Sequence, residues 1–152
     1  MYASALMAFL HHAAAFAVVA TLAVETALFK PPLTSAQARR LRITDNIFGA
    51  AAGVVLVVGL LRVAYFEKGS HFYWHDLFFL AKFSAFLVAA LISVYPTVVF
   101  LSWRKDLKAG IAPQIAPECI RRVRVCLMLE LTAILVIVFC AAFMARGFGF
   151  LR

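Results

Sequence analysis

Long apolar stretches alternate with short polar connections along the whole chain. Four stretches, over 3–29, 46–66, 77–103 and 123–145, are each long enough to supply the about 20 apolar residues that a membrane-spanning helix needs. Pro31 and Pro32 end the first stretch, because a helix interior cannot accommodate two missing N–H donors. The pattern predicts an all-α integral membrane four-helix bundle, with residues 1–152 forming one transmembrane domain.

Polar residues near the stretches predict where two of the helices begin or bend. Thr44 or Asp45 lies directly before the second stretch and can cap that helix with a side-chain oxygen. Pro96 falls inside the third stretch, where we expect a kink. Ser93 or Thr97 is expected to bond to the carbonyl that the proline frees.

Basic residues gather in two of the connections. They are Lys30, Arg39, Arg40 and Arg42 after the first stretch, and Arg104, Lys105, Lys108, Arg121, Arg122 and Arg124 before the fourth. The middle turn and the tail hold few cations. The positive-inside rule places the two basic connections in the cytoplasm. We therefore expect the bundle to be N-out and C-out.

The composition agrees with a chain that lies in lipid. Hydrophobic residues make up 65% of the chain and charged residues only 14%, far from the roughly half and quarter of soluble domains. A net charge of +8 raises the question of nucleic acid. The cations flank the apolar stretches, however, and form no continuous patch with interleaved aromatic residues. The expected partner is the lipid bilayer, and no nucleic acid is expected.

Small residues form one face of the second stretch. Gly49 and Gly53, with alanines between them, make a small-xxx-small surface that lets another backbone approach closely. This surface could pack inside the bundle or form a homodimer contact, and the sequence leaves both open.

Several ionisable side chains lie inside the apolar stretches. Each costs about 2.5 to 3.5 kcal/mol at a helix centre, so such residues usually face the bundle interior. They are His11, His12, Glu25, Arg62, Lys82 and Glu130. Depths taken from about 1.5 Å of rise per residue place the histidines, the arginine and the lysine in the outer half. The two glutamates fall in the inner half, where arginines or Lys30 of the basic connections are their simplest partners.

The outer cluster has the chemistry of a cofactor site. Imidazole is the commonest metal ligand and a haem axial ligand, and four-helix bundles commonly hold cofactors between facing helices. Positions seven apart nearly eclipse on a helix, which puts His75 and Lys82 on one stripe. His11 is expected to face the interior, with His12 turned about 100° away.

We therefore expect a ligand pair of His11 or His12 with His75 to bind one haem near the outer face. Arg62 or Lys82 would neutralise a propionate, and these two cations are the candidate catalytic residues. Copper is the alternative, with His11 and His75 as metal ligands. Arg62 could instead snorkel to the outer headgroups.

The chain resembles an uncharacterised bacterial family of predicted four-helix membrane proteins. The likeness rests on segments 10–12, 59–62, 65–69, 73–75, 79–82 and 93–97, together with Trp103. It implies a multi-pass protein of the bacterial inner (cytoplasmic) membrane.

More distantly, the layout is similar to HemJ-type protoporphyrinogen oxidases and CopD-type copper-resistance proteins. In the HemJ pattern a histidine of the first helix accompanies a lysine of the third, positions that correspond to His11 or His12 and to Lys82. That family is described as binding haem b. The resemblance implies an oxidoreductase active in electron transfer or tetrapyrrole oxidation. The alternatives are a CopD-like copper transport or handling protein and a non-catalytic accessory or assembly subunit.

Overall fold

Four long helices make up most of the structure. A computed structural model describes residues 2–67 and 70–150. Within these residues the chain is helical without strands, and four helices are long and apolar enough to cross a membrane. They are α1 (Tyr2–Leu28), α2 (Ser35–Leu61), α4 (Leu77–Ser102) and α6 (Pro117–Ala145). The predicted all-α four-helix membrane bundle is confirmed.

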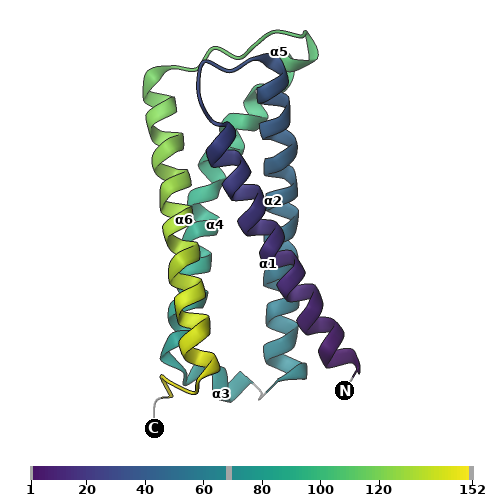
Figure 1. Cartoon of the computed structure of the whole chain (residues 1–152), viewed down its shortest axis with the longest axis vertical. Helices are drawn as coiled ribbons and strands as arrows, with labels where there is room; N and C mark the ends of the chain where they lie inside the picture. The colour runs from purple at the N-terminus through teal and green to yellow at the C-terminus, as the bar shows by residue number, and fades with distance from the viewer. Residues whose placement is uncertain (1, 68–69, 151–152) are drawn as a thin grey trace.

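The four helices form two pairs that lie side by side. α1 packs on α2 and α4 packs on α6, with α1 tilted relative to the others (Figure 1). Both termini lie at one end, beside the short helix α3 (Ser70–Trp74). The opposite end carries the 29–34 connection, α5 (Arg104–Lys108) and the 109–116 connection. We name these the terminal end and the loop end. Which of them faces the cytoplasm stays a prediction.

The start of α2 differs from the prediction. The helix begins at Ser35, not at residue 46, so Thr44 and Asp45 lie inside it and do not cap it. Thr34 is the cap: its hydroxyl accepts from the Gln37 amide at 3.2 Å, and the Gln37 side chain accepts from the Thr34 amide at 2.9 Å. Basic and polar side chains fill the first turns of this helix, which is why its apolar pattern starts late.

The other helix starts follow ordinary capping chemistry. Asp76 precedes α4 and accepts from the Phe79 amide at 3.0 Å, close to the predicted start. α6 begins at Pro117, six residues before the predicted start at 123, because proline suits the first position of a helix, where no N–H is needed. At the far end of α2 the backbone widens into a single π-helical turn, η1 (Arg62–Phe66).

Pro96 lies inside α4, as predicted, and is buried. The expected repair of its freed carbonyl is wrong for both hydroxyls. Ser93 Oγ donates to the Ala90 carbonyl at 2.8 Å, and Thr97 Oγ1 donates to Asp45 Oδ1 at 2.8 Å. The second of these bonds joins α4 to α2, so it fixes one helix pair against the other.

The main core lies toward the loop end. Large apolar side chains of the four long helices, of α5 and of the residues next to them meet there, including Leu22, Phe29, Leu41, Phe100, Trp103, Leu107, Val123 and Leu127. The terminal end is closed differently, by the tail after α6. The Leu77 amide donates to the Gly149 carbonyl at 2.9 Å. Gly149 has a φ of +95°, and a Cβ there would lie 2.5 Å from Phe78 Cδ2, so this position requires glycine.

The bond between Thr97 and Asp45 gives a test of the fold. Thr97→Val leaves a buried carboxyl oxygen without its donor, so we expect the free energy of unfolding in detergent to fall by about 1 to 2 kcal/mol. Thr132→Val is the matched control, because that exposed hydroxyl bonds only within its own helix. Equal losses in the two variants would contradict a role for the cross-helix bond.

Candidate functional site

A cavity of about 500 Å³ lies between the two helix pairs, toward the terminal end. Four of the five predicted site residues line it: His11 and His12 from α1, Arg62 from η1 and Lys82 from α4. Apart from Glu67 and Tyr73, the rest of the wall is apolar. It includes Val55, Leu56, Phe79, Phe83, Phe86, Ile137, Val138, Ala141 and Met144. The structure therefore brings together the imidazoles and cations that the sequence predicted to lie in the outer half of the membrane.

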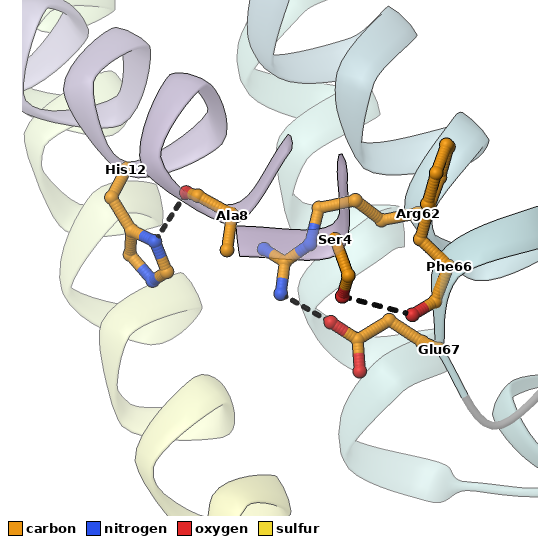
Figure 2. A network of polar contacts seen from close by, with 6 residues as sticks. All are labelled: Ser4, Ala8, His12, Arg62, Phe66 and Glu67. Carbon is orange, nitrogen blue, oxygen red and sulfur yellow. Dashed lines mark hydrogen bonds and ion pairs between the residues drawn. The ribbon is translucent and has the colours of Figure 1, made fainter. Parts of the chain in front are cut away.

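Arg62 is held by a partner that the sequence did not reveal. Its Nη2 lies 2.5 Å from Glu67 Oε1, and Ser4 Oγ donates to the Phe66 carbonyl nearby at 3.4 Å (Figure 2). Arg62 and Glu67 are five positions apart and are linked by the π-helical turn, a spacing that ordinary helical phase does not bring together. The Nε of Arg62 is buried and has no hydrogen-bond partner. The pair with Glu67 thus leaves one donor of this guanidinium without a partner.

His12 has one ring nitrogen fixed by the backbone. Its Nδ1 lies 2.6 Å from the carbonyl of Ala8, one turn earlier on α1 (Figure 2). A carbonyl only accepts, so in the neutral ring the proton sits on Nδ1. Nε2 then carries the free lone pair, which is the nitrogen a metal would take.

His11 is more buried than His12 and lies against α2. A Cβ built on Gly59 would be 3.1 Å from His11 Cε1, so the absent side chain of Gly59 makes room for the ring. His11 Nδ1 is buried without a hydrogen-bond partner. The two imidazoles meet edge to face with centroids 5.9 Å apart. Both therefore belong to the cavity wall, although the helical phase had favoured His11 alone.

Lys82 enters the cavity from α4. Its Nζ lies 5.3 Å from the centre of the Phe79 ring, close enough for a cation–π contact. The ion pairs found among residues 2–67 and 70–150 do not include it. A desolvated ammonium group of this kind can take an anion from a ligand.

Tyr73 from α3 also lines the cavity, and the sequence analysis did not single it out. Burial raises the pKa of its phenol, and the Glu67 carboxylate adds to the effect. The phenol is therefore protonated at neutral pH and can donate a hydrogen bond.

His75 is not brought to this site. It is exposed in the turn before α4, where its Nδ1 lies 2.8 Å from the His71 carbonyl and its ring stacks on that of His71 at 4.2 Å. The expected ligand pair of His75 with His11 or His12 is not assembled. Across the described ranges, no three His, Cys, Asp or Glu side chains are grouped to hold a metal ion.

Buried carboxyl groups lie nearer the loop end. Glu25, Asp45 and Glu130, from α1, α2 and α6, are 1%, 4% and 2% exposed. The expected ion pairs of the glutamates with Lys30, Arg122 or Arg124 are wrong, because these cations are exposed and the ion pairs of the described residues include neither glutamate. One oxygen each of Glu25 and Glu130 is buried without a hydrogen-bond partner.

A second cavity of about 340 Å³ adjoins the first. Its wall is apolar apart from Ser93, Thr97 and Glu130. Gly49 and Gly53 also line it, and a Cβ on either would meet no atom within 4 Å. Among the described residues, no helix therefore packs closely on the face of Gly49 and Gly53, and the expected packing role inside the bundle is wrong. The homodimer contact stays a prediction.

Comparison with known proteins gives a family match. The model of a family described as "Predicted membrane protein (DUF2214)" matches residues 3–149. No curated protein and no solved structure matches the chain significantly.

The contact between Gly59 and His11 can be tested without any ligand. Gly59→Ala places a methyl group 3.1 Å from His11 Cε1, so we expect the histidine ring to move and its NMR resonance to shift in detergent-solubilised protein with labelled histidine. The resonances of His71 and His75 should stay in place. Gly53→Ala is the control, since open space surrounds that position. An unmoved His11 signal in Gly59→Ala would show that the ring does not lie against α2.

Proposed function

Since the chain belongs to the DUF2214 family of predicted membrane proteins, and that description states no activity, we propose from the first cavity itself that this protein binds haem b and takes part in electron transfer. It is a multi-pass membrane protein, and the bilayer is its surroundings. No curated protein matches the chain, so the expected likeness to HemJ-type and CopD-type proteins adds no support. The proposal therefore depends on the side chains that line the cavity.

The donor set of the cavity suits a haem. Its volume of about 500 Å³ falls within the range of about 300 to 1,000 Å³ that is usual for cofactor and ligand sites. Aromatic and aliphatic side chains cover most of the wall, as an apolar macrocycle needs. The same cavity is lined by imidazoles that would hold the iron and by cations that would pair with the propionates. Haem b, when bound, supplies one-electron transfer.

The arrangement of His12 carries the proposal. A histidine that ligates a metal usually donates its other ring N–H to a carbonyl or carboxylate, which fixes the tautomer and the ring orientation. His12 already makes this bond to the Ala8 carbonyl, at 2.6 Å. Its Nε2 is free on the cavity wall. His11 lies beside it on the cavity wall, so the imidazoles that would hold the iron come from α1 and not from His75.

The two cations have different roles. Arg62 is already paired with Glu67, so it offers the hydrogen bonds that the pair leaves unused. Lys82 has no carboxylate within ion-pairing distance in the described part of the chain. Lys82 is therefore the principal partner for a propionate, and Arg62 and Tyr73 would complete the polar rim. Both cations act here by binding and orienting the cofactor.

Haem binding predicts an absorption spectrum that depends on His12. Protein purified from haem-sufficient cells should show a Soret band, and His12→Ala should lower the haem content at least about tenfold. His75→Ala is the control, because that ring lies outside the cavity and should change nothing. Absence of a Soret band in the unaltered protein would reject the proposal. Copper found by metal analysis would then favour copper handling, and no metal at all would favour an accessory subunit.

Lys82 should set the affinity for a haem with free propionates. Lys82→Met keeps the length of the side chain and removes its charge, so we expect haem affinity to fall about 10- to 100-fold. Lys30→Met, at an exposed position near the loop end, is the control. Haem dimethyl ester, which lacks the charged carboxylates, should bind the unaltered protein and Lys82→Met with similar affinity. A similar loss with both forms of haem would argue against an ion pair at Lys82.

A further inference from the structure

The second cavity offers hydrogen-bond acceptors and few donors. Three polar side chains line it, Ser93, Thr97 and Glu130. The hydroxyl hydrogen of Ser93 is used on the Ala90 carbonyl, and that of Thr97 is used on Asp45 Oδ1. Their oxygens keep only lone pairs for a ligand. A molecule that forms hydrogen bonds with these two hydroxyl oxygens must bring its own donor.

Glu130 is the main hydrogen-bond acceptor of this cavity. The residue is 2% exposed, and its Oε1 is buried without a hydrogen-bond partner. A carboxyl group keeps an acceptor oxygen in either protonation state. Burying a polar atom without a hydrogen-bond partner destabilises the protein. A ligand that supplies a matching donor would remove this cost in free energy. An unpartnered, almost fully buried side chain on the wall of a cavity therefore marks the place of a ligand.

The small residues of α2 leave this cavity accessible from the side of the bundle. Gly49 and Gly53 are exposed and line the cavity, and a Cβ on either would meet nothing within 4 Å. Both lie well inside a membrane-spanning helix, so the medium beside them is hydrocarbon. A ligand that enters there must be soluble in lipid.

We infer that the second cavity binds an apolar molecule that carries a hydroxyl group, of the phenol or hydroquinone class, which enters past Gly49 and Gly53 and donates its hydroxyl hydrogen to Glu130. The volume of about 340 Å³ is at the lower end of the range for small-molecule sites. The inference goes beyond haem binding and does not require it, because none of these polar residues lines the first cavity.

Two probes that differ in one hydrogen-bond donor test the inference. They are 4-heptylphenol and its methyl ether, 4-heptylanisole, measured by equilibrium dialysis with the haem-free protein at one detergent concentration. The ether partitions into micelles at least as well as the phenol, so partition cannot explain tighter phenol binding. We expect the phenol to bind saturably and about tenfold more tightly than the ether. Equal affinities would overturn the inference.

Variants of the two buried glutamates locate the site. Glu130→Leu should weaken phenol binding about tenfold and bring it to the affinity of the ether. Glu130→Gln keeps an acceptor oxygen and should bind within a few-fold of the unaltered protein, which also guards against misfolding of the leucine variant. Glu25→Leu is the matched control, since Glu25 is equally buried but lies outside this cavity. A similar loss with Glu25→Leu would place the effect in the fold, not in the site.

Access past the small residues is tested in the same assay. Gly53→Leu should fill the open space and reduce binding of both probes, whereas Ala50→Leu, on an exposed position of the same helix outside the cavity wall, should leave both affinities unchanged. Unchanged binding in Gly53→Leu would overturn the proposed site. Because no haem is present, these results are independent of the Soret measurement on the first cavity.

Discussion

The cost of an unpartnered polar group in hydrocarbon governs this bundle. Within the helices, most backbone N–H and C=O groups form hydrogen bonds with one another. The side chains are therefore the polar groups that still need partners. Thr97 and Asp45 meet it by bonding across two helices, and Arg62 and Glu67 meet it by pairing at the end of α2. Glu25 and Glu130 each keep a buried oxygen without a hydrogen-bond partner. Glu25 lines neither cavity, whereas Glu130 lines the second one, so Glu130 is the carboxyl group that a ligand could reach.

The two halves of the bundle are built from side chains of different size. Toward the loop end, rings such as Phe100 and Trp103 fill the space between all four long helices. Farther along the bundle, Gly49, Gly53 and several alanines leave room between the helix pairs. A well-packed half fixes the register of the helices, so the other half can enclose cavities without losing its geometry. The cavities thus depend on the core that lies beyond them.

The sequence predicted the helices well because apolar length alone determines whether a segment can span a bilayer. It also predicted that His11, His12, Arg62 and Lys82 would meet, since depth follows directly from helical rise. The prediction failed for His75 because α4 begins only at Leu77. His75 lies before the helix, so it does not share the helical face of Lys82. The partners Glu67 and Asp45 were missed for a related reason. They depend on a π-helical turn and on the relative rotation of α2 and α4, which no single-helix pattern contains.

The two cavities share an apolar wall but attract opposite kinds of polar group. Six side chains belong to both: Ala15, Val55, Leu56, Phe86, Ile137 and Val138. On one side of this wall lie two imidazoles, the ion pair of Arg62 with Glu67, and Lys82, whose charge favours an anionic group. On the other side lie oxygens with free lone pairs, which favour hydroxyl donors. Because charges act strongly where water is excluded, an anionic head group would favour the Lys82 side of this wall over the oxygens of the second cavity. The interior is therefore better described as two adjoining sites than as one long channel.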